Sequence, residues 1–483
     1  MTSTPYYPLM IADHIDTGHS RKEVLSPYDE RLLGHVGSAN AATVDHALTV
    51  AYALFRDRRR WLSTLERIAI LERAIDLMQQ HSEALALGAA AEGGKPLIDS
   101  RVEMARCIDS IRACVDALRN DAPATIPMGI NAASQHRLTS MRKEPIGVVV
   151  AISAFNHPLN LIAHQVGPAI AAGCPVIVKP AENTPLSCFR LVEIFHQAGL
   201  PTEWCQALLT DDHMIAEQLA TDPRVAFLSF IGSAKVGWHL RSKLAPGTRC
   251  ALEHGGVAPV IVTDTADIDS AVPSLAKGSF YHAGQVCVSV QRIYAHHSIA
   301  HTLAEKLAKA ANKMIVGNPE AERTEVGPII RKAELSRIAS WVNEAIEMGA
   351  EVVCGGQVLR DNCYSPTVIL NPPLNARVST HEVFGPVVCI YSYTDLDEAI
   401  AQANRLEFAF QAAVYSQNID QAFAIADRLD ASAVMLNEHT AFRVDWMPFA
   451  GLKHSGLGTG GIPYTFNDMQ VEKMIVLTSP AIR

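Results

Sequence analysis

The chain has 483 residues, too many for one hydrophobic core, so we expect two main domains. Hydrophobic residues make up 48% of the chain and charged residues 19%, which excludes a disordered or fibrous protein. The formal net charge of −9, without a long basic run, argues against a nucleic-acid partner. The sequence shows no signal-peptide pattern and no apolar run of about 18 residues, so we expect a cytoplasmic protein with no membrane partner.

The ten cysteines show no paired C-x-x-C spacing, so neither a zinc site nor a dithiol redox site is indicated. In a reducing compartment most of them are expected to be thiols in the core. We therefore predict no metal site.

The first 120 residues are predicted to be largely helical. Residues 43–56 have apolar positions at helical spacing, which is typical of an amphipathic helix. Ser63 and Glu66 form a capping-box pattern that opens a second helix, and residues 93–96 interrupt it. Residues 98–118 predict a third helix.

Two later segments predict a small separate β element. Residues 137–143 alternate in polarity, which indicates an edge strand or a hairpin that projects from the body. Residues 470–477 can form a final strand, pairing either with that hairpin or with a partner subunit.

After Pro145, short apolar runs alternate with helical segments, which predicts parallel sheet covered by helices on both faces. The candidate strands are residues 147–152, 175–178, 225–229 and 259–262, and the candidate helices are 165–172, 185–198, 212–220 and 234–244. A second series has predicted helices 267–281, 299–314, 332–348, 396–404 and 419–429, with strands near Val290, Val352, Val387, Gln411 and Ala433. The domain boundary is predicted at residues 253–256, where two glycines separate the series.

Ligands in open parallel sheets bind at the carboxyl ends of the strands, so the loops there are candidates for chemistry. Lys179 and Glu182 flank a proline turn and suit the two hydroxyls of an adenosine ribose. Gly232 and Ser233 precede a helix, as a pyrophosphate at a helix N-terminus requires. Each motif also fits an ordinary turn and cap. The Gly-x-Gly-x-x-Gly match at residues 456–461 follows no clear strand and runs into proline instead of a helix, so we discount it as a dinucleotide fingerprint.

Three further residues could carry covalent catalysis. Cys287 lies among small and apolar residues just before a predicted strand, where it is either a buried thiol or a nucleophile. Asn156 either forms a turn or donates to an oxyanion. Glu253 follows a short apolar stretch, where a partly desolvated carboxylate could act as a base or could instead cap a helix or form a salt bridge.

Taken together, these motifs resemble the aldehyde dehydrogenase superfamily, in order over most of the chain. Glu253 precedes Cys287 by 34 residues, as in that family. The segments that carry the resemblance are 155–158, 179–182, 230–233, 252–256, 284–287, 382–386 and 448–456.

The resemblance implies an α/β fold with two doubly wound α/β domains and a small β oligomerisation element. It assigns residues 1–126 and 146–253 to an NAD-binding domain, 254–465 to a catalytic domain, and 127–145 with 466–483 to the oligomerisation element. A homodimer or homotetramer is expected.

The resemblance also implies roles for the site residues. Cys287 would attack the aldehyde, Asn156 with the backbone N–H of Cys287 would hold the oxyanion, and Glu253 would activate water. The implied cofactor contacts are Phe155, Lys179, Glu182, Gly232, Ser233, Glu382 and Phe384. Because a glutamate at 182 would repel the 2′-phosphate of NADP, NAD is favoured over NADP.

The substrate is expected to be a small, anionic aldehyde, with phosphonoacetaldehyde as the first prediction. Arg106 and Arg443 match positions where phosphate- or phosphonate-handling relatives bind the anion, although a structural salt bridge such as Arg443 with Asp445 is equally open. His157 resembles the same branch of the family and is a further candidate substrate contact. Some of those relatives carry an arginine just before the nucleophile, and here that residue is Val286.

Three alternatives stay open at this point. A CoA-acylating semialdehyde dehydrogenase would have no need of a hydrolytic base, so Glu253 argues against it. A dehydrogenase for neutral aldehydes and, more remotely, a non-catalytic binding homologue are the others.

Overall fold

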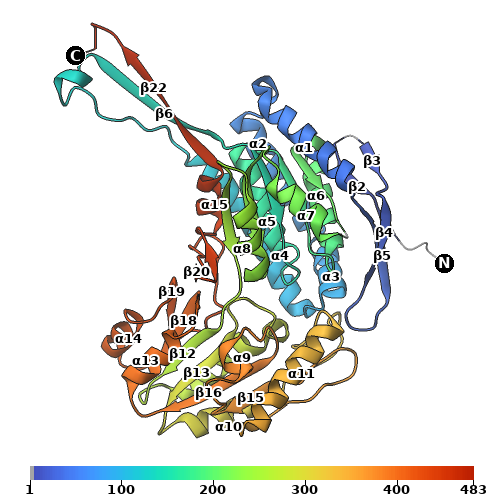
Figure 1. Cartoon of the computed structure of the whole chain (residues 1–483), viewed down its shortest axis with the longest axis vertical. Coiled ribbons are helices and arrows are strands. Elements are labelled where there is room, and N and C mark those ends of the chain that lie inside the picture. Colours follow the sequence, from blue (N-terminus) through green and yellow to red (C-terminus); the bar gives the residue numbers. More distant parts are fainter. Residues whose placement is uncertain (1–4, 13, 211, 483) are drawn as a thin grey trace.

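The computed structural model describes residues 5–12, 14–210 and 212–482 of the chain. Two α/β lobes, each built on its own sheet, lie one beneath the other, and a two-stranded ribbon projects from the first lobe (Figure 1). This arrangement confirms the predicted fold class.

The sheet of the first lobe has the strand order β21-β11-β10-β7-β8-β9-β2-β3. Its centre is parallel, whereas β2, β3 and β21 join in antiparallel pairings. The strands are β2 Leu9–Ile11, β3 His14–Asp16, β7 Val148–Ile152, β8 Val176–Lys179, β9 Cys205–Ala207, β10 Val225–Ile231, β11 Arg249–Glu253 and β21 Gly456–Leu457. The parallel centre agrees with the prediction, and the antiparallel edges are an addition to it.

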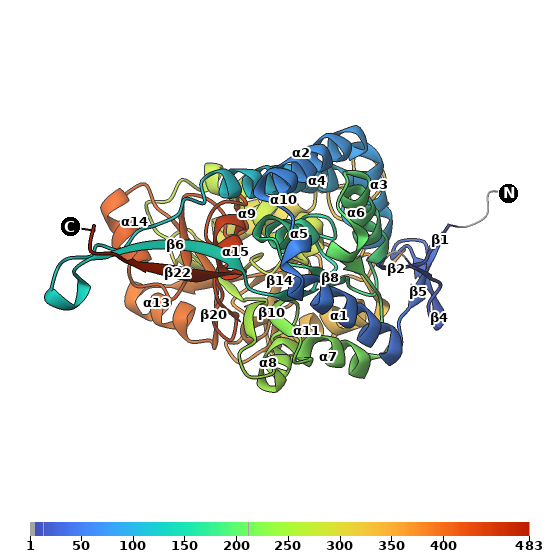
Figure 2. The ribbon, with the colours of Figure 1, turned by 90° about the horizontal axis from the view of Figure 1, so that it is seen from above.

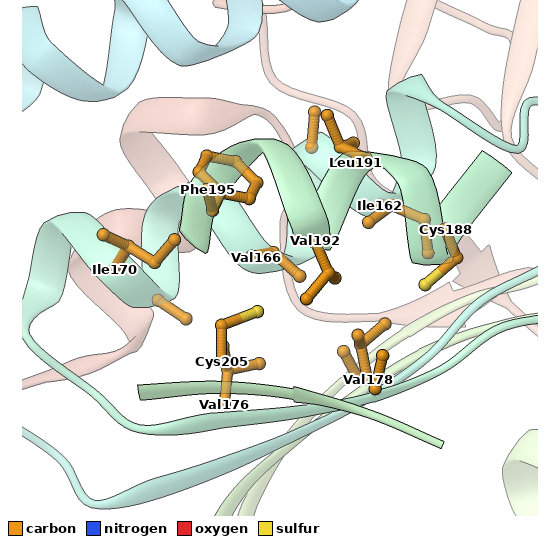
Figure 3. Close-up of a cluster of buried hydrophobic side chains, with 14 of the residues drawn as sticks. Ile162, Val166, Ile170, Val176, Val178, Cys188, Leu191, Val192, Phe195 and Cys205 are labelled. Carbon is orange, nitrogen blue, oxygen red and sulfur yellow. The ribbon is translucent and has the colours of Figure 1, made fainter. Parts of the chain in front are cut away.

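Helices cover this sheet because the central strands are apolar on both faces, as every residue of β7 and β8 is buried. The covering helices are α1 Ala41–Arg56, α2 Thr64–Gln80, α3 Ser82–Gly93, α4 Leu97–Arg119, α5 Asn160–Ala172, α6 Pro185–Gln197, α7 His213–Thr221 and α8 Ala234–Lys243. In Figure 3, branched and aromatic side chains of α5 and α6 pack over Val176, Val178 and Cys205. Truncating Phe195, which is fully buried there, to alanine would cost about 3–5 kcal/mol.

The predicted capping box is confirmed. The Ser63 hydroxyl accepts from the backbone N–H of Glu66, and the Glu66 carboxylate accepts from the backbone N–H of Ser63 at 2.7 Å. These reciprocal bonds satisfy two donors that the first turn of α2 would otherwise leave free.

The prediction that the first 120 residues are largely helical is confirmed from residue 41 onward and is wrong for the described residues 5–12 and 14–38. Here the chain forms β1 Tyr6–Tyr7, β2, β3, β4 Ser20–Leu25 and β5 Leu32–Ser38, and β1, β5 and β4 make a separate small sheet. Several of these strands have only two or three residues, too few to show a period of two.

The sheet of the second lobe has the order β14-β15-β16-β13-β12-β18-β19 and its own hydrophobic core. Its strands are β12 Ala258–Val262, β13 Val290–His296, β14 Glu351–Cys354, β15 Thr367–Leu370, β16 Val387–Tyr393, β18 Gln411–Tyr415 and β19 Ala433–Leu436. Its helices are α9 Ile268–Phe280, α10 Ala300–Ala311, α11 Lys332–Glu347, α12 Arg377–Thr380, α13 Leu396–Asn404 and α14 Ile419–Ala426. The strand predicted at 259–262 therefore opens this second sheet, because β12 pairs with β13 and β18.

The projecting ribbon consists of β6 Arg137–Pro145 and β22 Gln470–Thr478. The two strands are antiparallel, with Met474 opposite Met141, which confirms that the C-terminal strand pairs with the earlier one. Figures 1 and 2 show the ribbon extending away from the body, with the C-terminus near its tip and the N-terminal strands on the opposite side of the molecule. Four consecutive residues of β22, Met474, Ile475, Val476 and Leu477, are exposed apolar side chains.

The remaining elements are short. They are the two-stranded pair β17 Phe408–Ala409 with β20 Leu452–Lys453, the helix α15 Ile462–Asp468, and the 3-10 turns η1 Arg58–Arg60, η2 Ala132–Ser134, η3 Thr202–Trp204 and η4 Tyr281–Gly284. None of the helices described is long and apolar enough to cross a membrane.

Candidate active site

A cavity of about 950 Å³ lies where the two lobes meet, at the carboxyl ends of β7, β10 and β11. Residues of the second lobe from Tyr281 to Val288, together with Glu382 and Phe384, complete its wall. The predicted site residues that line it are Arg106, Phe155, Asn156, His157, Glu182, Gly232, Ser233, Glu253, Cys287, Glu382, Phe384 and Arg443. The fold thus brings together residues that are far apart in the sequence.

The loop before Cys287 has an unusual backbone. His282, Ala283 and Gly284 are three consecutive left-handed residues, with φ of 50°, 53° and 67°. A side chain at 284 would place its Cβ 2.1 Å from the carbonyl oxygen of Gly385, so only glycine fits. The Gln285 side chain then fixes the loop, because its Oε1 accepts from Ile330 N at 3.0 Å and its Nε2 donates to Pro328 O at 3.2 Å.

Asn156 is tied to the same loop. Its Nδ2 donates to the carbonyl oxygen of Gln285 at 3.0 Å, which holds the buried amide two residues from Cys287. The segment that carries Asn156 is itself anchored by Glu103, whose Oε1 accepts from Leu159 N at 2.8 Å and from Asn160 N at 2.9 Å. A preorganised amide donor beside a nucleophile is the arrangement that stabilises an oxyanion.

The thiol of Cys287 is protonated in this environment. Burial raises its pKa to about 12, and the carboxylates of Glu382 and Glu253 add to the shift, while the charge of Arg443 opposes it. Of the ten cysteines, all of which the structure describes, Cys287 and Cys250 are the two that are not fully buried. Reaction at Cys287 therefore requires a base that removes the thiol proton.

Glu253, the last residue of β11, is placed to be that base. Burial raises the pKa of its carboxyl group, and the charge of Arg443 opposes the shift. A carboxylate with a raised pKa accepts a proton near neutral pH more readily than a solvated one.

The glycine-rich segment at residues 456–461 lies against Glu253 and leaves room for its carboxylate. It begins in strand β21, where Gly456 pairs with Glu253, and it leads into α15 with Pro463 in the first turn, so the prediction that it runs into proline instead of a helix was wrong. A Cβ at Gly460 would lie 2.2 Å from Glu253 Oε1, so the glycine leaves room for the carboxylate.

The opposite end of the cavity fits a nicotinamide dinucleotide. Gly232 and Ser233 precede α8, and the Ser233 side chain makes no capping bond, so its hydroxyl and the helix N-terminus can face a pyrophosphate. Glu382 accepts from Gly256 N at 3.2 Å, and burial raises its pKa to about 8. The rings of Phe155 and Phe384 meet edge to face at 5.8 Å between centroids.

Lys179 and Glu182, which were predicted to bind the adenosine ribose, are arranged differently from expectation. Lys179 is buried, donates to Pro180 O at 3.3 Å, and does not line the part of the cavity wall that the structure describes, so its ribose contact stays a prediction. Glu182 does line the cavity, and its carboxylate is paired with Lys22 at 2.6 Å. No sequence motif pointed to Lys22, because it lies on β4, 160 residues before Glu182.

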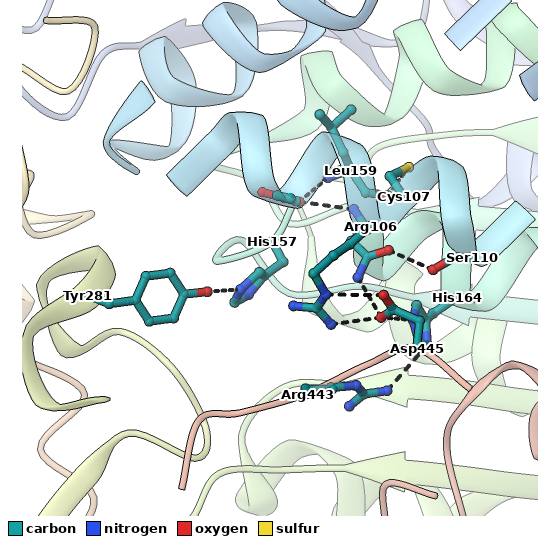
Figure 4. Close-up of polar contacts among 11 residues, drawn as sticks. Arg106, Cys107, Ser110, His157, Leu159, His164, Tyr281, Arg443 and Asp445 are labelled. Carbon is teal, nitrogen blue, oxygen red and sulfur yellow. Dashed lines mark hydrogen bonds and ion pairs between the residues drawn. The ribbon is translucent and has the colours of Figure 1, made fainter. Parts of the chain in front are cut away.

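A charged cluster lies on the substrate side, shown in Figure 4. Asp445 accepts two bonds from Arg106, at 2.7 and 3.1 Å, one from His164 Nε2 at 2.7 Å and one from Asn160 Nδ2 at 3.0 Å. Although burial alone would raise the pKa of Asp445, these partners hold it well below the usual range. The suggested salt bridge of Arg443 with Asp445 is therefore wrong. Asp445 forms its salt bridge with Arg106 instead.

Arg443 has no carboxylate partner within the described chain. Its guanidinium carbon lies 3.5 Å from the centre of the Phe449 ring, and its buried Nε has no hydrogen-bond partner there. Burial lowers its pKa and the charge of Glu253 opposes that shift, so the cation is close to the carboxylate of Glu253. The Nη2 of Arg443 lies 3.5 Å from His164 Nδ1, so the guanidinium is only partly satisfied, and such a group lining a cavity is suited to bind an anion.

Several residues of this cluster were not predicted from the sequence. Tyr281 donates or accepts a short hydrogen bond with His157 Nε2, and both line the cavity. His164 is neutral, because burial lowers its pKa to about 4. Asn160 and Asp445 lie just outside the motifs at 155–158 and 448–456, and that proximity was the available signal; His164 and Tyr281 had none.

Among the residues that the structure describes, no cluster of three or more His, Cys, Asp and Glu side chains could hold a metal ion.

Comparison with known proteins shows which family the chain resembles. Residues 14–475 match the aldehyde dehydrogenase family. The chain is 35% identical over 478 residues to 3-sulfolactaldehyde dehydrogenase of Priestia aryabhattai, covering 99% of each chain. The crystal structure of aldehyde dehydrogenase 21 from Physcomitrella patens, in complex with the reaction product succinate, is 32% identical, with a TM-score of 0.94 over 99% of this chain and 100% of that one. Glyceraldehyde-3-phosphate dehydrogenase from Methanocaldococcus jannaschii, complexed with NADP, is also 32% identical, with a TM-score of 0.90 over 95% of this chain and 100% of that one.

Proposed function

The chain belongs to the aldehyde dehydrogenase family, and we propose that it oxidises short aldehydes that carry a single negative charge. It is an oxidoreductase that acts on small aldehydes with NAD or NADP. The observation that carries the substrate proposal is Arg443, a cavity-lining cation near Cys287 without a carboxylate partner in the described chain.

In the proposed reaction, Glu253 takes the thiol proton of Cys287 and releases it to solvent. The sulfur attacks the aldehyde carbon, and the resulting oxyanion is held by Nδ2 of Asn156 and the backbone N–H of Cys287. The dinucleotide, when bound, accepts a hydride from that carbon, which leaves a thioester on Cys287. Glu253 then takes a proton from water, the water oxygen attacks the thioester, and the C–S bond breaks to release the carboxylic acid.

The charge count favours a monoanion over a dianion. Two guanidinium groups line the substrate side, but the charge of Arg106 is balanced by Asp445, and His164 is neutral. That leaves the single positive charge of Arg443, and the residue before the nucleophile is the apolar Val286. One positive charge matches a sulfonate or a carboxylate.

Two of the similar proteins fit this proposal by their names. One is a 3-sulfolactaldehyde dehydrogenase, whose substrate carries a sulfonate, and another was crystallised with succinate as reaction product. Phosphonoacetaldehyde, the first prediction from the sequence, would bring a second negative charge that this cluster does not balance, so we rank it below the sulfonate and carboxylate aldehydes.

The test is a panel of short aldehydes of equal length that carry a sulfonate, a carboxylate, a phosphonate or no charge. We expect kcat/KM to be highest for the monoanions and acid to form without CoA, since Glu253 supplies a hydrolytic base. A highest kcat/KM for the neutral aldehyde would refute the substrate proposal, and acid formation only with CoA would support the acylating alternative.

We also propose the domain roles. Residues 1–126 and 146–253 would bind the dinucleotide, residues 254–465 would supply the nucleophile, and residues 127–145 with 466–483 would join subunits in a homodimer or homotetramer. The exposed apolar row of β22 supports the last role, because a water-exposed strand with consecutive apolar residues is expected to be covered. Replacing Val476 by Asp should then lower the mass measured by light scattering.

A further inference from the structure

The carboxylate of Glu182 is balanced by a residue from the small N-terminal sheet. Lys22, on β4, places its ammonium 2.6 Å from Glu182 Oε2, and the two side chains are 30% and 34% exposed. Lys22 also lines a second cavity of about 320 Å³, which shares Glu182 and Asn183 with the main one. The two cavities therefore meet at the carboxylate that was predicted to contact the adenosine ribose.

The local charge around Glu182 is not negative. Burial alone would raise the pKa of this carboxyl group, but the hydrogen bond from Lys22 and the charges of Lys22 and Lys179 lower it. Glu182 is thus ionised, with one lysine bonded to it and a second close by. The expected repulsion of a 2′-phosphate holds only for a carboxylate whose charge is not compensated.

An ion pair between side chains this exposed is weak, so Lys22 can also bind a second anion. Partly exposed lysine–carboxylate pairs contribute about 0–1 kcal/mol, because water competes for both partners. A phosphate beside the ribose carries more charge than Glu182 and three acceptor oxygens, and the three N–H donors on the flexible stem of lysine let its ammonium contact both anions.

From this geometry we propose that Lys22 is a cofactor-specificity residue, whose ammonium donates to the adenosine 2′-phosphate while it stays close to Glu182, so that the site accepts NADP as well as NAD. The proposal rests on the proposed function only in that the cleft binds a nicotinamide dinucleotide. It requires no change in the residues that carry the chemistry.

The test uses titration calorimetry with two fragments, 5′-ADP and 2′,5′-ADP, on the whole protein. Replacing Lys22 by Met should weaken 2′,5′-ADP about tenfold and change 5′-ADP less than about twofold, because only the former carries the 2′-phosphate. The ratio of kcat/KM for NADP to that for NAD should fall by a similar factor.

Lys332→Met is the matched control. Lys332 lines the same small cavity, but its ammonium is bonded to Glu30 at 2.5 Å, so its loss should leave both affinities unchanged. Removing the competing anion in Glu182→Gln should tighten 2′,5′-ADP and not 5′-ADP.

The outcomes separate the two proposals. If 5′-ADP binds but 2′,5′-ADP is equally weak in the wild type and in Lys22→Met, the role of Lys22 is refuted and the dinucleotide site stands. If neither fragment binds, the dinucleotide site itself is refuted and the role of Lys22 with it.

Discussion

The two ends of the cleft both hold a carboxylate paired with a cation, and they differ in burial. At the substrate end, Asp445 is 2% exposed and accepts from Arg106, His164 and Asn160. At the cofactor end, Glu182 is 34% exposed and is bonded by Lys22. A buried ion pair cannot be separated without leaving a desolvated charge. An ion pair that is about one-third exposed is accessible to a ligand, which can form an additional contact with one of its members. The first pair therefore fixes the shape of the site, and the second can take part in recognition.

The largest expected effect tests whether the substrate end and the cofactor end of the cleft both act with Cys287 as the nucleophile. Replacing Cys287 by Ala should lower the rate of NAD(P)H formation about 10⁴-fold or more, because the nucleophile is lost. Binding of 5′-ADP, measured by calorimetry, should stay within about twofold. The control is Cys250→Ala, at the other partly exposed cysteine, which should retain activity. Residual turnover near the wild-type rate would remove Cys287 from the mechanism.

The next effect concerns the buried pair. Replacing Asp445 by Asn leaves Arg106 without its carboxylate and should lower the free energy of unfolding by about 3 kcal/mol, measured by urea denaturation. Glu182→Gln, at the half-exposed pair, should cost less than about 1 kcal/mol. Equal losses would contradict the distinction between the two ends.

The same pair predicts the sign of a pH effect. The folded-state pKa of Asp445 is depressed, so its contribution to stability is fully present above the unfolded value of about 3.9 and is lost as the pH falls toward the folded value. The wild type should therefore lose more stability below pH 4 than Asp445→Asn does.

A smaller effect separates the two arginines. Arg443→Leu should lower kcat/KM for a sulfonate or carboxylate aldehyde by about 10- to 100-fold, and for a neutral aldehyde of the same length much less, because a charged hydrogen bond is lost. Arg106→Leu should chiefly lower stability, since its guanidinium is occupied by Asp445. If Arg443→Leu affected both aldehydes equally, the arginine would be structural.

The smallest expected effect is on the reactivity of the Cys287 thiol. Because Glu253 is the proposed base for the thiol proton, Glu253→Gln should slow alkylation of Cys287 by iodoacetamide severalfold at a fixed pH, although loss of the carboxylate also removes one cause of the raised thiol pKa. The replacement should at the same time slow hydrolysis of the thioester. Faster alkylation in Glu253→Gln would contradict the role of Glu253 as base for the thiol.

Local sequence patterns predicted individual helices, and the order of the motifs predicted which residues form the site. The helix predicted at 396–404 is α13 within the same bounds, and Asn156, Glu253 and Cys287 meet in one cavity. The pairings of charges were out of reach, because they join residues distant in sequence. Lys22 and Glu182 are 160 residues apart, and Arg106 and Asp445 are 339 apart, so no periodicity or motif spacing relates them.

The way in which the C-terminus returns to the first lobe has a consequence for biosynthesis. Ile462, Phe466 and Met469 belong to the core of the first lobe, β21 extends its sheet, and β22 pairs with β6. A ribosome makes these residues after those of the second lobe. The second lobe can therefore fold before the core of the first lobe is complete, and that incomplete core is a surface that a chaperone could bind.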